Sequence, residues 1–285
     1  MKKIEISAPA KTNLWLRVFG KREDGFHDLE TRMVALSLAD QLTLEAVTST
    51  EEVFLSCNDA RLETGEENLA IRAVRILEDH CDRQFGLRIH LEKRIPLAAG
   101  LGGGSSDAAA VLKGLNQLFQ LGLAVDDLSA LAAKLGSDVP FFVYDSPCDC
   151  RGRGEMISPV EMNEELPILL AKPAFGITAA WAYRNWENSI EIPGVSYVPQ
   201  VCPWGALIND LERPVFEKFF ILPRLKMWLL DQPETHAALL SGSGSTMLVV
   251  LAEADGGERL AERMKARFGH SMWTYVGHTL GGNMG

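Results

Sequence analysis

Hydrophobic and polar residues alternate along several stretches of the first half of the chain. The alternation is clearest in residues 14–18, 36–45, 53–57 and 87–91. A period of two is typical of a strand with one buried face, so these stretches are predicted to be β-strands. Another strand begins at residue 4, and we expect Pro9 to end it, because proline has no N–H for the ladder of hydrogen bonds.

Other stretches place hydrophobic residues three and four positions apart, which predicts helices with one apolar face. Residues 69–77 follow Asn68, a residue type that caps helices. Residues 108–119 show the same spacing, and so do residues 128–135, where Gly136 would end the helix. Strands and helices therefore mix along the chain, as in an α/β or α+β protein.

The second half mixes strands and helices as well. The segment 148–155 is rich in turn residues and leads to Pro159, so we place a domain boundary there, with domains at residues 1–158 and 159–285. The later pattern predicts a strand at 168–171, a helix at 179–186, helical segments at 209–220 and 225–230, and then a strand, a helix and a strand that ends near residue 276.

A glycine-rich loop joins the strand at 87–91 to the helix that follows. Gly100 and residues 102–104 allow close approach of the backbone to a ligand. Residues 105–107, Ser-Ser-Asp, are of the type that opens a helix, whose first N–H groups attract anions such as phosphate. Neither the Walker spacing nor the Rossmann spacing fits the loop. The alternative is a flexible turn that binds nothing.

Composition narrows the choice of partner. The chain has 285 residues and a formal net charge of −10, which argues against nucleic acid, because phosphate-backbone affinity needs clustered Lys and Arg. The amino terminus lacks the apolar core of a signal peptide and no apolar run could span a bilayer, so we expect a cytoplasmic protein that binds no membrane. The five cysteines include no CxxC pair, and no metal-ligand set is predicted.

Two charged residues are candidates for catalysis. Lys11 is expected on the same strand face as Asn13, which would place an amine beside an amide; the alternative is a solvated lysine at a sheet edge. Asp138 stands just before Pro140. It would either cap a helix that begins there or hold a carboxylate that orients or deprotonates a hydroxyl. The local sequence leaves both choices open.

Two further turns carry possible binding groups. Phe26 and His27 leave a charged turn, where an aromatic ring and an imidazole could stack on a planar ligand and bind its edge. A lone histidine is more often an ordinary surface or core residue, and the pattern does not decide. Residues 240–246 form a glycine-serine turn before a buried strand, which is either a tight hairpin or a second loop packed against the first.

Taken together, five segments resemble a known family. They are PAKTNL at residues 9–14, DGFH at 24–27, IPLAAGLGGGSSDAA at 95–109, GSDVPFF at 136–142 and LSGSGST at 240–246. The chain is similar in all of them, and in their order, to the galactokinase, homoserine kinase, mevalonate kinase and phosphomevalonate kinase (GHMP) superfamily. The first two segments resemble the members that phosphorylate a cytidine diphosphate-linked methylerythritol.

The resemblance implies a two-domain α/β (α+β) fold, with an N-terminal domain like domain 2 of ribosomal protein S5 and a ferredoxin-like C-terminal domain. It implies an ATP-dependent kinase of isoprenoid precursor synthesis that uses Mg²⁺ and acts on the C2 hydroxyl of its small-molecule substrate. The catalytic residues would be Lys11 and Asp138. The residues around ATP would be Asn68, Lys93, Pro96, Leu97, Ala98, Ala99, Gly100, Leu101, Gly102, Gly103, Gly104, Ser105 and Ser106.

For the substrate, the resemblance implies Asn13 near the hydroxyl, His27 at the cytosine edge, and Phe26 and Tyr183 as stacking faces. Phe26 replaces a tyrosine that is frequent in the family, which removes a hydroxyl and keeps the ring. Two alternatives stand beside this prediction: another kinase of the superfamily, of the homoserine or mevalonate type, and a noncatalytic nucleotide-binding regulator. The sequence leaves the oligomeric state open.

Overall fold

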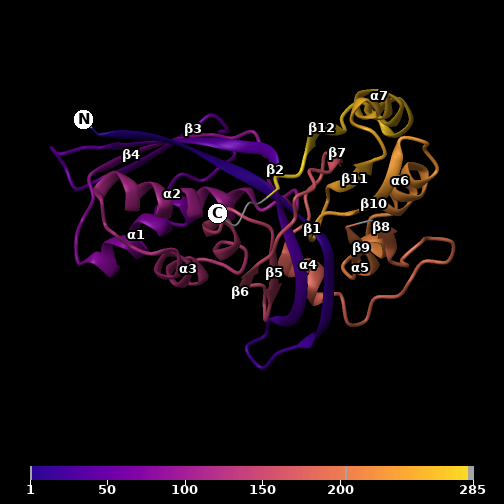
Figure 1. Cartoon of the computed structure of the whole chain (residues 1–285), viewed down its shortest axis with the longest axis horizontal. Helices are drawn as coiled ribbons and strands as arrows, with labels where there is room; N and C mark the ends of the chain where they lie inside the picture. The colour runs from indigo at the N-terminus through magenta and orange to yellow at the C-terminus, as the bar shows by residue number, and fades with distance from the viewer. Residues whose placement is uncertain (1, 203, 282–285) are drawn as a thin grey trace. The chain divides into compact units, whose positions relative to one another are not determined.

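A computed structural model describes residues 2–202 and 204–281 (Figure 1). The chain forms two compact units. The first comprises Met1–Ala10, Leu38–Pro96 and Gly102–Asp145, and the second comprises Lys11–Ser37, Leu97–Leu101 and Ser146–Gly285. These units draw on separate stretches of the chain and do not follow the single boundary expected near residue 158. The division into domains 1–158 and 159–285 stays a prediction about sequence segments.

The first unit contains a sheet in the order β3 (Val53–Cys57), β4 (Leu87–Glu92), β2 (His27–Ala46) and β1 (Lys3–Lys21). Strands β1 and β2 are long and contribute residues to both units. β4 runs antiparallel to β2 and parallel to β3. Along β4, buried and exposed residues alternate strictly, which confirms the strand predicted from the period of two.

Helices α1 (Leu69–Cys81), α2 (Gly103–Phe119) and α3 (Val125–Ala133) and the 3₁₀ helix η1 (Pro140–Val143) complete the first unit. α1 and α2 lie side by side (Figure 1). α2 packs closely on the sheet at Gly114, where a Cβ would lie 2.3 Å from Leu44 Cδ1 and 3.1 Å from Ile6 Cδ1. Buried residues of all three helices face this core.

The second unit holds the remaining parts of β1 and β2 and the strands that pair with them. β5 (Cys148–Arg151) pairs with β2 and with β6 (Met156–Pro159), so the segment expected to be only a turn forms a hairpin. β9 (Gly205–Asn209) runs parallel to β1, and β8 (Gln200–Cys202) pairs with β9. The strands of the described residues form two sheets. Strands β5, β6, β8 and β9 belong to the same sheet as β1 and β2.

The second sheet has the order β10 (Thr235–Leu240), β11 (Met247–Leu251), β7 (Pro167–Lys172) and β12 (Trp273–His278), with every pair antiparallel. Helices α6 (Ile221–Leu230) and α7 (Gly257–Phe268) pack on it. Every residue of β11 is buried, because the sheet lies in the core of this unit. The other elements are α4 (Ala179–Arg184), α5 (Glu212–Lys218) and η2 (Ala254–Gly256).

Two predicted element boundaries are wrong. Pro9 does not end a strand, because β1 continues through it from Lys3 to Lys21; the pairing of β1 with β9 involves Trp15 and Leu16, beyond Pro9. The helix expected at 209–220 is the shorter helix α5, and the strand β9, which was not predicted, ends where that helix was expected to begin. Among the described helices, none has the length and hydrophobicity that crossing a bilayer requires.

Candidate active site

The glycine-rich loop opens α2 without any side-chain cap. Gly102 is the N-cap residue, with φ 70° and ψ 15°, in the left-handed region that favours glycine. The helix begins at Gly103, so Ser105, Ser106 and Asp107 lie inside the first turns and do not open the helix as expected. The first intrahelical bond runs from Ser106 N–H to Gly102 O, at 2.9 Å. Helix geometry leaves the earlier N–H groups available to an anion.

Ser106 carries a buried hydroxyl suited to a ligand. Its side chain is 1% exposed, and Oγ has no hydrogen-bond partner among the described residues. A buried hydroxyl without a partner is costly unless a ligand satisfies it. This hydroxyl and the N–H groups beside it fit a phosphate with Mg²⁺, which prefers oxygen ligands. No group of three or more His, Cys, Asp or Glu within the described ranges is arranged to hold a metal ion by itself.

In the second unit, residues 97–101 of the glycine-rich loop pack against the turn between β10 and β11. Gly100 has φ 76°, and a Cβ there would lie 2.3 Å from Ser241 O and 2.8 Å from Gly244 N. Ser241 Oγ donates to Gly100 O at 3.2 Å, and Thr246 N–H donates to Ala99 O at 3.3 Å. The turn is therefore a hairpin connection and also a second loop packed against the first.

Lys11 is buried in β1, with 5% of its surface exposed, which excludes the solvated edge lysine. Its Nζ donates to Asn13 Oδ1 at 2.9 Å, so the two side chains share a strand face as predicted. Asn13 Nδ2 donates to Thr31 Oγ1 at 2.7 Å, and Thr31 donates in turn to Trp15 O at 2.6 Å. This chain of bonds fixes the amide with its oxygen toward the lysine.

The second glycine loop also lies against this pair. A Cβ placed on Gly242 would lie 3.5 Å from Lys11 Nζ, 3.3 Å from Asn13 Oδ1 and 3.0 Å from Gly100 O. The backbone of Lys11 also binds the first loop, because the main-chain N–H of Lys11 donates to Leu101 O at 2.9 Å. Within the second unit, the structure therefore brings together an ammonium group, an amide and the backbones of two glycine loops. Such a group of donors suits a phosphoryl group.

Asp138 lies in the first unit, between α3 and η1, and is partly exposed. It does not cap η1, because Val139 is the N-cap residue and no side-chain cap bond is formed there. Pro140 occupies the first position of that helix, as expected. The capping alternative for Asp138 is wrong, and the catalytic role stays a prediction.

His27, at the start of β2, lies against aromatic residues that follow β7. Its ring stacks on Tyr183 of α4, with ring centroids 5.7 Å apart and an angle of 27° between the planes. Trp186 meets the same imidazole edge-on at 6.2 Å. Burial and the charge of Lys21 lower the pKa of His27, against a smaller opposing effect of Glu187, which favours a neutral imidazole that both donates and accepts hydrogen bonds.

Phe26 is half-exposed, with 48% of its surface open to solvent. The guanidinium carbon of Arg153 lies 4.9 Å from the centre of its ring. The turn before Phe26 is closed by Arg22 N–H, which donates to Phe26 O at 2.7 Å, and by Gly25 with φ 85°. His27 and Tyr183 are thus adjacent as predicted, while Phe26 pairs with an arginine that the sequence did not single out.

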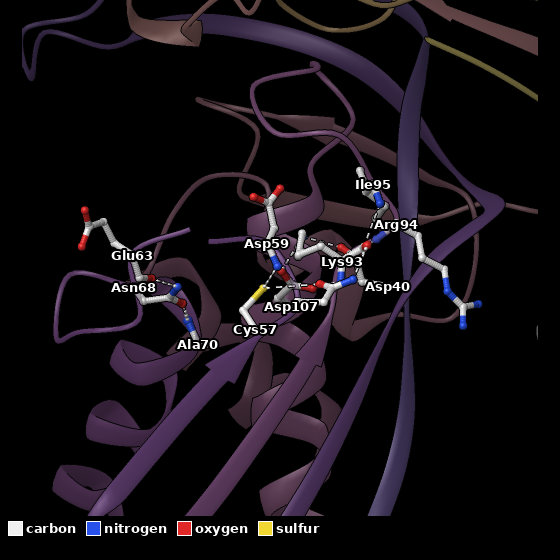
Figure 2. Close-up of polar contacts among 11 residues, drawn as sticks. Asp40, Cys57, Asp59, Glu63, Asn68, Ala70, Lys93, Arg94, Ile95 and Asp107 are labelled. Atoms are coloured by element: carbon white, nitrogen blue, oxygen red, sulfur yellow. Dashed lines mark hydrogen bonds and ion pairs between the residues drawn. The ribbon is translucent and has the colours of Figure 1, made fainter. Parts of the chain in front are cut away.

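The two remaining nucleotide residues have protein partners in the first unit (Figure 2). Asn68 caps α1: its Oδ1 accepts from Ala70 N–H at 2.9 Å, and its Nδ2 donates to Glu63 O. Lys93 Nζ donates to Asp107 Oδ2 at 2.7 Å and to Asp40 Oδ2. Burial opposes the charged form, yet the charges of Asp107 and Asp40 outweigh it and raise the pKa of Lys93.

The partners that hold the predicted residues were not predicted from the sequence. Thr31 orients Asn13, Trp186 contacts His27, and Asp40 binds Lys93. None of these lies inside one of the five recognised segments. Thr31 and Asp40 stand in alternating strand patterns, where nothing local separates a buried polar residue from a solvated one.

Comparison with known proteins identifies the fold of this chain. The family model described as "GHMP kinases N terminal domain" matches residues 68–146. The fold agrees with solved structures across the superfamily, including a homoserine kinase from Cytophaga hutchinsonii, with a TM-score of 0.73 over 99% of this chain and 95% of that one at 17% identity. The fold is therefore that of the GHMP kinases, and the predicted α/β (α+β) class is confirmed.

Relatives of higher sequence identity show the family to which the chain belongs. A "4-diphosphocytidyl-2-C-methyl-D-erythritol kinase" of Methylacidiphilum infernorum is 38% identical over 272 residues, covering 93% of each chain. One of Syntrophotalea carbinolica is 39% identical, covering 92% of this chain and 94% of the relative. A crystal structure of 4-(cytidine 5'-diphospho)-2C-methyl-D-erythritol kinase has a TM-score of 0.81 at 34% identity, covering 98% and 100%. The chain belongs to the 4-diphosphocytidyl-2-C-methyl-D-erythritol kinase family.

Proposed function

We propose that this chain transfers the γ-phosphoryl group of ATP to the C2 hydroxyl of 4-diphosphocytidyl-2-C-methyl-D-erythritol. The products are the 2-phosphate and ADP, and the reaction belongs to non-mevalonate isoprenoid precursor synthesis. One observation carries the proposal: in a chain of this family, a buried lysine held by Asn13 lies beside the backbones of both glycine loops. Phosphoryl transfer needs this kind of positioning and charge neutralisation.

The ATP phosphates bind along residues 96–106. The N–H groups at the start of α2 and the positive end of the helix dipole receive the anion. Ser106 Oγ, which has no partner among the described residues, is the side-chain group available to Mg²⁺. When bound with ATP, Mg²⁺ neutralises phosphate charge. Asn68 and Lys93 are also proposed to bind the nucleotide.

Lys11 stabilises charge on the transferring phosphoryl group. Its ammonium is desolvated, so its attraction for the phosphoryl oxygens is stronger than it would be in water. The bond to Asn13 holds the ammonium in place, and Thr31 holds Asn13. Asn13 also positions the C2 hydroxyl of the substrate in the proposed arrangement.

Asp138 accepts or orients the proton of the C2 hydroxyl as the oxygen attacks phosphorus. The new O–P bond forms as the bond from phosphorus to the β-bridging oxygen breaks, and ADP takes the electron pair. The hydroxyl proton passes to the carboxylate and then to solvent. Asp138 is partly exposed, so solvent can reach the residue to which the proton passes.

The cytidine end of the substrate binds among His27, Phe26 and Tyr183. A neutral imidazole has one donor and one acceptor for the cytosine edge, and the aromatic rings offer stacking faces. Homoserine, mevalonate and sugars carry no pyrimidine that would use these groups. The proposed specificity for a cytidyl substrate over those acceptors rests on this cluster and on the family.

Release of ADP tests the function. Wild-type protein with Mg²⁺-ATP should turn over 4-diphosphocytidyl-2-C-methyl-D-erythritol, and should not turn over methylerythritol phosphate, mevalonate or homoserine. Asp138→Asn should reduce kcat by at least about 10²-fold and leave ATP binding in place. Asp145→Asn is the matched control, because Asp145 is an exposed carboxylate of the same unit that pairs with Lys113.

Turnover of another acceptor would replace the proposed substrate, and failure with all of them would favour the noncatalytic regulator. An Asp138→Asn variant with near-normal kcat would remove the role given to Asp138. Because the reaction consumes ATP, it agrees with the cytoplasmic location expected from the sequence. The net charge of −10 agrees with a small-molecule substrate and with no nucleic-acid partner.

A further inference from the structure

Three ionisable side chains of the first unit form a buried cluster, Asp40, Lys93 and Asp107 (Figure 2). They come from β2, from the residue after β4 and from α2, and their side chains are 0%, 5% and 5% exposed. Nζ of Lys93 donates to one oxygen of each carboxylate. Burying three ionisable groups is costly, and a fold keeps such a cluster stable only if the groups satisfy one another.

The two carboxylates are not equivalent. The second oxygen of Asp40 accepts from the N–H groups of Arg94 and Ile95, at 2.6 and 2.8 Å. The second oxygen of Asp107 is buried and has no partner among the described residues. Asp40 therefore anchors the chain after β4, while Asp107 connects the lysine to α2. The cluster ties the sheet to the helix through one ammonium group.

The ammonium lies directly against the glycine-rich loop. A Cβ placed on Gly103, the first residue of α2, would lie 3.2 Å from Lys93 Nζ and 3.1 Å from Ile95 Cγ2. Asp107 follows Gly103 by four residues and is one helical turn further along. Lys93 and Asp107 together thus contact the turn whose free N–H groups face the anion.

We infer that Asp40 and Asp107 are positioning residues for ATP. They hold Lys93 against Gly103, and the lysine in turn fixes the backbone of the first turn of α2 in the orientation that receives the phosphates. The inference rests on the proposed function for the identity of the ligand. It assigns two residues to the nucleotide site that do not touch ATP themselves.

The test separates KM from kcat. Asp107→Asn keeps the shape and removes the carboxyl group that binds Lys93, and should raise KM for ATP about tenfold, the loss of one hydrogen bond to a charged group. The KM for the cytidyl substrate should change less than twofold. Asp40→Asn is the second variant, because Asp40 lies on β2 and accepts from the same ammonium group of Lys93.

Glu78→Gln is the matched control. Glu78 is a buried carboxylate of the same unit, paired with Arg75, and it accepts from Phe85 N–H at 2.8 Å away from the loop. This variant should lower the melting temperature as much as Asp107→Asn and leave KM for ATP unchanged. An Asp107→Asn protein that loses stability but keeps KM for ATP within twofold of wild type would overturn the inference. If Asp107→Asn does not fold, the KM for ATP of Asp40→Asn is measured in its place, and the same criterion applies.

Calorimetric titration with ADP separates this inference from the proposed function, because it needs no acceptor. Weaker ADP binding by Asp107→Asn supports the inference even if the wild type fails to phosphorylate the cytidyl substrate. Equal ADP binding by wild type and by both variants overturns it even if that reaction is confirmed.

Discussion

The absence of a side chain at Gly100 allows the two glycine loops to pack against each other. Its φ of 76° is unfavourable for other residues, and the backbone of residues 241–244 fills the space where a Cβ would stand. Gly100→Ala should push the two loops apart, lower kcat/KM by at least about tenfold and lower the melting temperature. Steady-state kinetics and thermal unfolding measure both effects.

Gly122→Ala is the control for Gly100→Ala. Gly122 has nearly the same φ, 73°, and nothing lies within 4 Å of its Cβ position. This variant should lose only about 1–2 kcal/mol of stability from backbone strain and keep full activity. If both variants have the same kcat/KM, the contact between the loops does not matter for function.

Thr31 offers a second test at this scale. Thr31→Val keeps the shape and leaves the Nδ2 of Asn13 without its acceptor, in a buried position. The amide should then turn away from Lys11, and kcat should fall about tenfold, in proportion to one lost buried hydrogen bond. Thr31→Ser retains the hydroxyl and should restore kcat. A Thr31→Val enzyme with wild-type kcat would show that the orientation of Asn13 is unimportant.

At the residue scale, the sequence predicted the groups that lie in recognised segments and missed those that hold them. Lys11 and Asn13 do share a strand face, and His27 does meet Tyr183. Asp107 was taken only for a helix-opening residue. Its bond to Lys93 depends on the packing of α2 against the end of β4, which no local pattern records.

At the element scale, a buried ion pair holds helices to a strand end in the second unit. Lys226 of α6 donates to Glu212 of α5 at 2.6 Å, and Glu212 also accepts from Leu240 N–H at 2.9 Å. Burial raises the pKa of Glu212, and the attraction of Lys226 opposes the shift. The carboxylate therefore depends on its partner to remain charged.

Lys226→Met should reduce the free energy of unfolding by about 3–5 kcal/mol, because it leaves a buried carboxylate unpaired. Denaturant unfolding measures the loss. Arg263→Ala breaks an ion pair with Glu234 that is partly open to solvent, and should cost less than about 1 kcal/mol. Equal losses of unfolding free energy in the two variants would show that burial does not increase the contribution of an ion pair to stability.

Element types followed from local patterns wherever one face of a strand or helix is polar, as in β4 and α1. Local patterns did not predict elements that depend on tertiary pairing. β9 is a strand because it pairs in parallel with β1, and β1 continues through Pro9 as one strand from Lys3 to Lys21. Gly102 caps α2 because its positive φ leads into the helix, although serines follow.

At the scale of the whole molecule, Asp107 should couple folding to pH. Burial raises its pKa to about 7, Lys93 opposes the shift and Asp40 adds to it, while the ordinary value is 3.8. Between these values the folded chain keeps a proton that the unfolded chain has released. This contribution to stability is complete below about pH 4 and is lost as the pH rises through 7.

Denaturant unfolding between pH 5 and 8 tests this coupling. The free energy of unfolding of the wild type should fall relative to that of Asp107→Asn across the interval, because the amide has no proton to release. Parallel curves would show that Asp107 is ionised throughout. The difference between the two proteins cancels the contributions of other carboxylates, which are shared.

The sequence predicted the fold class of the whole molecule through its resemblance to a superfamily. It did not predict the composition of the two compact units. The chain enters the first unit three times, and β1 and β2 each supply residues to both units. A boundary drawn from turn-rich composition assumes that neighbours in sequence stay together, and long strands violate that assumption.

This interleaving limits how such a protein can be inherited and rearranged. A single genetic crossover exchanges everything on one side of a point, but the first unit ends with residue 145 and lacks residues 11–37 and 97–101. A crossover at any one position therefore leaves at least one unit assembled from both parents. Hybrids between related genes should survive when the parents match along β1 and β2, and new specificities should arise more readily by local substitution than by exchange of whole modules.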